Sequence, residues 1–350
     1  MFLSAKKRLI KGEIQSVELL RGIASIMVCY FHLTQGNTNF LPATDPVKQS
    51  GTWGWTGVEV FFVISGFIIP YSMYVKNYVV EDFPTFLWKR VIRIEPPYII
   101  SVAIVIVLNY VSTLSPYYRG SAFVPDWGNA LGHIAYLNVF TGGTWLNPVY
   151  WTLAIEFQYY ILMAFCFGIL TSPSRILRLA FFSIFAGISF LHFYEGRFIF
   201  GHSLFFLAGI LLFQFAANII DRKEFGILFV FLLILMGFTQ GTVLTVLTTI
   251  ALMVLLWVDK VPRLFRKLGM ISYSLYLLHV PIGGRIINIA ETKIHNIRLR
   301  ELIVFVALAV CLAVSWVFYR YVEGLFKRLS SSIKYKPNPM EKVQFEKATI

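Results

Sequence analysis

The sequence predicts an all-α integral membrane protein, a bundle of about ten transmembrane helices. Mean hydropathy is high, at +0.68. Only 14% of the 350 residues are charged, too few to cover the surface of a soluble protein of this length. Apolar runs long enough to cross a bilayer recur from the first residues almost to the last. These three observations also agree with the 33 phenylalanines, 18 tyrosines and 8 tryptophans, which suit lipid-facing and interfacial positions.

Ten apolar runs have roughly the 17–25 residues that a transmembrane helix requires. They cover residues 16–36, 54–75, 92–113, 149–170, 178–195, 199–218, 224–240, 242–258, 268–289 and 301–323. The first run carries Glu18 and Arg21 and ends without a small-residue cleavage site, so a retained helix is favoured over a signal peptide. An amphipathic stretch over 129–140 is too short and polar to span, which predicts a re-entrant or interfacial helix.

Basic residues orient the bundle and set its boundaries. The net charge of +13 lies mostly in short segments between the apolar runs, which favours positive-inside orientation over nucleic-acid binding. We expect a basic cytoplasmic N-terminus over 1–15, a transmembrane domain over 16–323 and a charged, flexible cytoplasmic tail over 324–350. All three cysteines lie inside apolar runs, so a disulfide framework is not expected.

The first span carries two ionisable residues, Arg21 and His32, at the ends of "RGIASIMVCYFH". Eleven residues make close to three helical turns, so both face the same way, about 16 Å apart along the axis. Arg21 lies near the cytoplasmic end and His32 in the outer half, where ionisable groups are costly and functional by default. The alternative is that Arg21 snorkels to the interface and His32 is a satisfied core histidine.

"WKRVIRIEPPY" enters the third span from the cytoplasm and places Arg90 and Arg93 on one helix face. Guanidinium forks match phosphate oxygens, so the pair predicts a phosphate clamp. Two alternatives stay open: both arginines are interfacial anchors, or Glu95 pairs with them.

"GWTGVEVFFVISGF" opens the second span from the outside and places Glu59 at about the depth of His32. A carboxylate there requires a partner, so we expect Glu59 to hydrogen-bond the His32 ring and fix its tautomer. A solvated carboxylate at the rim is the alternative. Ser65 and Gly66 form a small-residue pair that predicts close helix packing.

Two further blocks place Glu156 about two turns deep in "YWTLAIEFQYY" and His279 near mid-depth in "ISYSLYLLHVPI". Either residue alone could be a structural link between helices. However, acid–base groups then occupy four spans in the middle or outer half, while arginines gather at the inner mouth. A cationic mouth suits a phosphorylated ligand, and deeper acid–base groups suit proton removal from a hydroxyl. The layout predicts acyl transfer from a nucleotide-bearing thioester to an alcohol on the far side.

The sequence gives no support to serine-hydrolase or zinc chemistry. No serine-hydrolase elbow, zinc-protease motif or P-loop is present in the sequence. Four cations fall on the outer side, against the positive-inside rule, and a surface for an anionic glycan or lipid would account for them. They are Arg285, Lys293, Arg298 and Arg300.

Taken together, these blocks resemble acyltransferase family 3, integral-membrane O-acyltransferases that acylate sugars of exported polysaccharides, lipopolysaccharides and related glycans. The similar elements run in the family's order from residue 14 to about 282. They are Arg21-x10-His32, "GVEVFFVISGF", Arg90-x-x-Arg93, "YWTLAIEFQYY" and "SYSLYLLH". Because it lacks an extracytoplasmic hydrolase-like domain, the chain is similar to the short exopolysaccharide-type members. Glu18, where many members have aspartate, and Glu95-Pro96-Pro97 depart from the family pattern.

The resemblance implies a coenzyme A thioester, most often acetyl-CoA, as acyl donor, and no metal. The acceptor would be a hydroxyl of a polysaccharide or lipid-linked oligosaccharide at the bacterial cytoplasmic membrane, with no nucleic-acid partner. The catalytic candidates are His32, Glu59, Glu156 and His279, and the donor-binding candidates are Arg21, Arg90 and Arg93. The resemblance singles out Arg21 and His32 as essential.

Two routes and one other function stay open at this stage. His32 acts as general base on the sugar hydroxyl, or carries the acyl group itself for a time. The acyl group is acetyl, succinyl or longer. The non-enzymatic alternative is a transporter of a glycan or lipid-linked intermediate, whose buried charges line a permeation path.

Overall fold

The computed structural model describes residues 14–115, 122–190 and 197–335, and these residues form helices and connecting turns with no strand. The longer helices are α2 (Gln15–Gln35), α4 (Gly57–Val75), α5 (Phe83–Thr113), α8 (Tyr150–Leu170), α9 (Arg175–Gly187), α10 (Ser203–Ala216), α11 (Arg222–Thr239), α12 (Thr242–Trp257), α14 (Ser272–Lys293) and α15 (Ile297–Phe318). The shorter ones are α3 (Pro46–Ser50), η1 (Gly54–Thr56), η2 (Val80–Asp82), α6 (Trp127–Gly132), η3 (Ile134–Tyr136), α7 (Asn138–Thr141), η4 (Ile188–Phe190), η5 (Ile199–His202), α13 (Arg263–Met270), η6 (Tyr319–Glu323) and α16 (Gly324–Ser332).

Six helical stretches among the described residues are long and apolar enough to cross a membrane. They are Gln15–Gln35, Pro46–Val75, Val80–Thr113, Tyr150–Leu170, Ile199–Ala216 and Ile297–Ser332. The other predicted runs lie on α9, α11, α12 and α14, of which α12 is apolar but short. Residues 191–195 of the fifth run lie outside the described residues. The all-helical fold is confirmed, and the count of about ten crossings stays a prediction.

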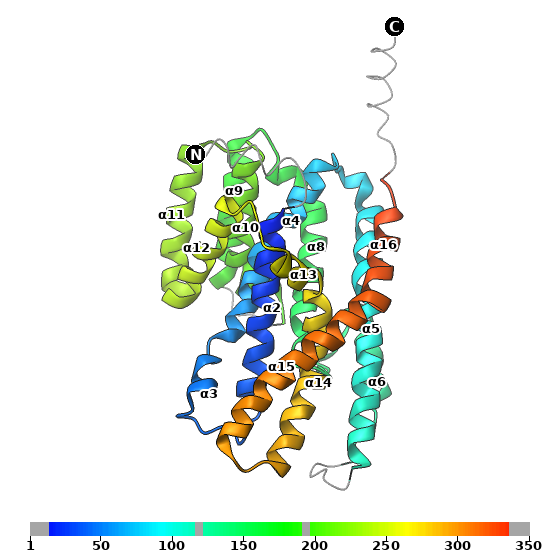
Figure 1. Cartoon of the computed structure of the whole chain (residues 1–350). Coiled ribbons are helices and arrows are strands. Elements are labelled where there is room, and N and C mark those ends of the chain that lie inside the picture. The colour runs from blue at the N-terminus through cyan, green and yellow to red at the C-terminus, as the bar shows by residue number, and fades with distance from the viewer. Residues whose placement is uncertain (1–13, 116–121, 191–196, 336–350) are drawn as a thin grey trace.

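The α2 helix lies between α11 and α12 on one side of the bundle and α5 and α16 on the other (Figure 1). It packs against α4, α13, α14 and α15. Ionisable residues on the inward faces of α2 therefore meet protein rather than lipid.

Close contact between α4 and α10 rests on glycine, as the small-residue pair predicted. A Cβ atom at Gly66 would lie 2.2 Å from the carbonyl oxygen of Phe206. One at Gly209 would lie 2.2 Å from the carbonyl oxygen of Val63. Any side chain at either position would push the backbones apart, so the predicted role of Gly66 in close packing is confirmed.

The stretch over 129–140 is broken rather than one helix, which corrects the prediction. Three short pieces, α6, η3 and α7, replace it. Ala135 and Tyr136 have φ values of 53° and 58°, a left-handed conformation that no α-helix continues through. His133 lies just before the break, and the backbone N–H of Leu146 donates to its Nε2 (3.2 Å). The segment is therefore a folded connection with its own hydrogen bonds.

Two of the four cations predicted on the outer side form hydrogen bonds within the protein. Arg285 donates from Nε to Ser112 Oγ (3.2 Å) and from Nη2 to Asn109 Oδ1 (2.7 Å), linking α14 to α5. Arg300 donates to the carbonyl oxygens of Ile294 (2.6 Å) and Phe40 (2.9 Å). These hydrogen bonds give Arg285 and Arg300 a structural role, which explains their presence at positions where the positive-inside rule does not predict cations.

The region expected to be a flexible tail begins with helix. The η6 turn and α16 continue α15, and α16 packs against α5. Residues 324–332 are thus ordered, which corrects the expectation for that part, while residues 336–350 lie outside the described residues.

Candidate active site

A cavity of ≈ 730 Å³ lies between α2, α4, α5, α8, α14 and the C-terminal helix α16. This volume falls within the range of about 300–1,000 Å³ typical of small-molecule sites. Six cationic side chains line it: Arg21, Lys76, Lys89, Arg90, Arg93 and Lys327. All three arginines predicted to bind the donor therefore line one cavity, although they come from two helices far apart in sequence.

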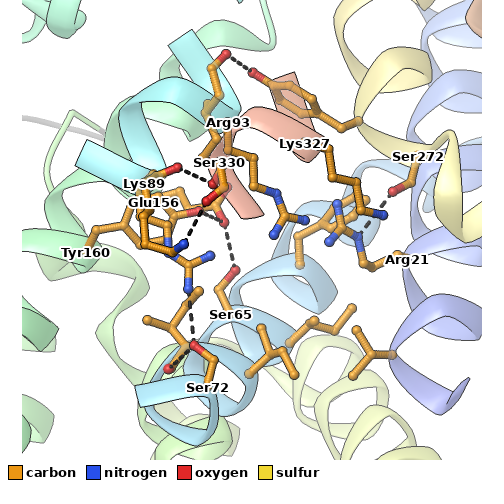
Figure 2. Close-up of a pocket in the computed structure, with 18 of the residues that line it drawn as sticks. Arg21, Ser65, Ser72, Lys89, Arg93, Glu156, Tyr160, Ser272, Lys327 and Ser330 are labelled. Atoms are coloured by element: carbon orange, nitrogen blue, oxygen red, sulfur yellow. Dashed lines mark hydrogen bonds between the residues drawn. The ribbon is translucent and has the colours of Figure 1, made fainter. Parts of the chain in front are cut away.

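Positive charge dominates the cavity wall. Its carboxylates are Glu18, Glu156 and Glu323, so six cations against three acids leave a formal charge of +3. Glu156 Oε1 accepts hydrogen bonds from Ser65 Oγ (3.1 Å) and Tyr160 Oη (2.6 Å) (Figure 2). The ion pairs found among the described residues all lie outside the cavity. The arrangement favours an anionic ligand.

Hydroxyl groups hold two of the arginines. Arg90 Nη2 donates to Ser72 Oγ (3.1 Å), and Arg21 Nε donates to Ser272 Oγ (3.2 Å). The Arg90 guanidinium also lies 5.3 Å from the centre of the Tyr160 ring. These partners orient the guanidinium groups without neutralising them.

Arg93 and Lys327 have no hydrogen bond or ion pair to a described residue. Figure 2 shows both side chains pointing toward Arg21 in the cavity. Glu95, the alternative partner for the arginine pair, is buried and forms no ion pair with Arg90 or Arg93. The donors of Arg93 and Lys327 are available to a ligand.

Lys76 follows the last residue of α4 at the same wall. Burial, together with the positive charges of Arg90 and Arg93, lowers the pKa of its ammonium group. Uncompensated like charges raise the free energy of the charged form, and a bound polyanion would reverse this effect.

His32 and His279 meet between α2 and α14. His279 Nε2 lies 3.2 Å from His32 Nδ1. Each Nδ1 also lies 2.9 Å from the carbonyl oxygen one turn earlier on its own helix, that of Val28 or Leu275. A carbonyl oxygen only accepts, so both Nδ1 atoms carry the hydrogen, and the neutral His279 presents Nε2 as an acceptor. The remaining nitrogen of neutral His32, Nε2, then holds a free lone pair.

Arg21 and His32 both contact α14, at Ser272 and His279 respectively. The prediction that they share one face of the first helix is confirmed, and that face meets protein.

Glu59 is not the partner of His32, so that prediction is wrong. Its Oε2 is buried and has no hydrogen-bond partner among the described residues. His279 occupies the position expected for it, because α14 rather than α4 presents a side chain to His32 Nδ1. Glu59, His32 and His279 are also absent from the cavity wall, unlike Glu156.

Tyr276 connects the cavity to the histidine pair. Its ring lines the cavity, and the ring centre lies 6.0 Å from that of His279, one turn further along α14. Tyr276 Oη shares a 2.7 Å hydrogen bond with Thr152 Oγ1. Tyr276 stands inside the "SYSLYLLH" block, so the sequence could have indicated it as a site residue. Its position beside the cavity, however, depends on contact with α8, more than a hundred residues away.

The family profile of the acyltransferase domain, acyltransferase family 3, matches residues 14–320. The chain belongs to acyltransferase family 3. Comparisons with curated proteins and with solved structures gave no significant match. With its apolar helices, the chain is a membrane acyltransferase. The matched range contains every predicted site residue and ends before Glu323, Lys327 and Tyr335, which also line the cavity.

Proposed function

We propose that this acyltransferase moves an acetyl group from cytosolic acetyl-CoA to a hydroxyl of an extracytoplasmic or lipid-linked glycan. The proposal rests on one observation: the same two helices build both the cationic cavity and the histidine pair. Helices α2 and α14 pair Arg21 with Ser272 at the cationic cavity and His32 with His279 further along. A phosphorylated donor and an acid–base group would thus be placed on one path.

The donor is inferred from the cavity. Coenzyme A carries three phosphate groups at one end of a long thioester arm, so it requires clustered cations beside a channel. Arg93 and Lys327 offer donors without partners among the described residues, and Arg21 lies beside them (Figure 2). Guanidinium and ammonium groups in a partly buried site bind phosphate more strongly than they would in water.

The reaction requires removal of one proton and exchange of two bonds. His32 Nε2 would take the proton of the acceptor hydroxyl as that oxygen attacks the thioester carbonyl carbon. The new C–O bond forms, the C–S bond breaks, and the thiolate of coenzyme A leaves and takes up the proton from His32. His279 and the carbonyl oxygen of Val28 both accept from His32 Nδ1–H and so would hold the ring in the tautomer that has a basic Nε2.

A covalent route uses the same atoms in a different order. His32 Nε2 would attack the thioester carbon first, and the C–S bond would break to release coenzyme A thiolate. The sugar oxygen would then bond to the acyl carbon, the C–N bond to the imidazole would break, and the hydroxyl proton would pass to the thiolate or to water. Incubating the purified protein with radiolabelled acetyl-CoA alone separates the routes. Label retained on the chain, and lost on adding acceptor, supports the covalent route; dependence of thiol release on acceptor supports direct transfer.

The test of function uses detergent-purified protein, acetyl-CoA and a cell-surface glycan fraction from a strain lacking the enzyme. Wild-type protein should release coenzyme A and add O-acetyl signals that NMR detects in the glycan. His32→Ala should abolish both while coenzyme A binding persists. Lys260→Ala, a change at an exposed lysine outside the cavity, is the matched control and should remain active. Full activity in His32→Ala would refute the assignment, and a transporter would show neither binding nor thiol release.

A further inference from the structure

One wall of the cavity is formed by a segment that lies beyond the family match. We call residues 324–335 the C-terminal strap. Four of its residues line the cavity: Lys327, Ser330, Ser331 and Tyr335. The family profile ends at residue 320, so this wall lies beyond the range that the profile matches.

Lys89 fastens the strap to α5. Its ammonium group donates to the carbonyl oxygens of Ser330 (2.6 Å) and Ile333, where α16 ends. Ser330 Oγ donates in return to the carbonyl oxygen of Lys89 (2.7 Å). The last carbonyls of a helix lack intrahelical partners and carry partial negative charge, so a cation there is favourable. One of the six cavity cations is thus committed to holding the strap in place.

Tyr335 is held at this wall by two neighbours. Lys76 Nζ lies 5.7 Å from the centre of its ring, and the ring of Tyr78 meets it edge-on with centres 6.4 Å apart. Tyr78 is fixed in turn, because its hydroxyl donates to the carbonyl oxygen of Ala164 (2.9 Å). A half-buried aromatic ring therefore stands next to a cluster of cations, and both face the cavity.

We propose that the C-terminal strap forms the nucleotide end of the donor site, with Tyr335 as the surface on which the adenine base stacks and Lys327 as a phosphate ligand. The inference rests on the proposed function and adds to it a recognition element beyond the residues that the family profile matches. An aromatic ring next to clustered cations matches a ligand with a flat base joined to phosphates, and base stacking on aromatic side chains is energetically substantial.

A purely structural role for Tyr335 predicts a different result from base stacking. If Tyr335 only closed the bundle, its loss would weaken every ligand of the cavity equally or lower the thermal stability alone. If it stacks on the base, its loss weakens only ligands that carry the base. Coenzyme A and 4′-phosphopantetheine, which lacks the adenosine part, distinguish the two roles.

The experiment is calorimetric titration of both compounds into full-length protein in detergent, with thermal unfolding of each variant measured in parallel. Tyr335→Ala should raise the Kd of coenzyme A by at least about fivefold, the lower end of base–aromatic stacking, and leave the Kd of 4′-phosphopantetheine unchanged. Tyr335→Phe, the matched control, keeps the ring and should bind coenzyme A like wild type. Tyr335→Leu keeps apolar bulk without the ring and replaces the alanine variant if that variant is unstable.

Three results overturn the inference. Equal weakening of both compounds, or no change in either, excludes stacking on Tyr335 while leaving the acyltransferase proposal intact. If wild-type protein binds neither compound, the proposed function itself fails and the inference fails with it.

Discussion

The imidazole rings of His32 and His279 form a hydrogen-bonded pair across α2 and α14, with His32 Nδ1 and His279 Nε2 3.2 Å apart. His279 uses its own Nδ1–H on the carbonyl oxygen of Leu275. It therefore acts toward His32 only as an acceptor. In the proposed reaction the pair would orient His32 so that Nε2 is basic, which gives His279 the role of a positioning residue rather than a second base.

Replacing His279 should slow acyl transfer without weakening the binding of the acyl donor. His279→Ala removes one of the two acceptors of His32 Nδ1–H and leaves the carbonyl oxygen of Val28, so the ring loses a constraint on its orientation, and we expect kcat to fall about 100-fold. The KM for acetyl-CoA should stay within about twofold, because His279 does not line the cavity. Steady-state thiol release measures both. His279→Gln offers an amide oxygen as acceptor and should recover part of kcat; equal loss in both variants would contradict a positioning role.

The sequence identifies the ionisable residues of the site but not all of their partners. Hydropathy and helical spacing place Arg21, His32 and Arg93 along the membrane normal, since each residue adds about 1.5 Å of rise. Depth does not tell which way a side chain faces. Glu59 lies near the predicted depth of His32, yet α14 contributes the partner, His279, 247 positions away in sequence. Such pairing depends on the order of helices around the bundle.

The sequence does not predict the ordered C-terminal strap, for a related reason. Its charged composition predicts a solvated tail. Its order comes from the bonds between Lys89 and the carbonyl oxygens of Ser330 and Ile333, which join the strap to a helix some 240 positions earlier. A lysine at the edge of a basic cluster gives no sequence signal for such a contact.

Arg93 is expected to bind the phosphates of the donor. Arg93→Ala removes a guanidinium that has no hydrogen-bond partner among the described residues. The substitution should therefore remove a contact to acetyl-CoA without removing a hydrogen bond within the described protein. Charged hydrogen bonds contribute about 1.5–3 kcal/mol, which predicts at least a tenfold rise in the KM for acetyl-CoA. The rise should shrink at high salt, because screening weakens the wild-type interaction. Arg93→Lys should fall between, and a KM like that of the Lys260→Ala control would refute the role.

Tyr276 is expected to keep water away from the thioester. Its ring stands between the cavity and His279, and Phe61 packs edge-on against it with ring centres 5.8 Å apart. Tyr276→Ala would open this barrier, so the ratio of acetyl-CoA hydrolysis to glycan acetylation should rise several-fold. Paired assays of thiol release and O-acetyl transfer give the ratio. Tyr276→Phe keeps the ring and loses only the hydroxyl contacts to Thr152 and Val149, so its hydrolysis-to-transfer ratio should stay like that of wild type. An unchanged ratio in the alanine variant would exclude the barrier.

The contact between α4 and α10 should be intolerant of a single methyl group. In Gly66→Ala the new Cβ would lie 2.2 Å from the carbonyl oxygen of Phe206, so the helices must separate. Overpacking of this kind costs about 1–3 kcal/mol of unfolding free energy. Gly168→Ala is the matched control, because a Cβ there meets no atom within 4 Å and alanine favours the helix. Thermal unfolding in detergent should show a lower Tm for the first variant only. Equal Tm values would mean that the contact is not close in the folded protein.

His133 should make the connection formed by α6, η3 and α7 sensitive to acid. Burial lowers the pKa of His133, whose Nε2 accepts from the backbone N–H of Leu146 and whose Nδ1 lies 2.9 Å from the carbonyl oxygen of Asn129. The folded state therefore favours the neutral ring, while the unfolded chain binds a proton near the ordinary pKa of about 6.5. Stability from this group is present above that pH and is lost as the pH falls below it. His133→Gln should lower Tm at pH 7.5, and the gap from wild type should narrow at pH 5.5. A gap of the same size at both pH values would show that protonation of His133 does not contribute to stability.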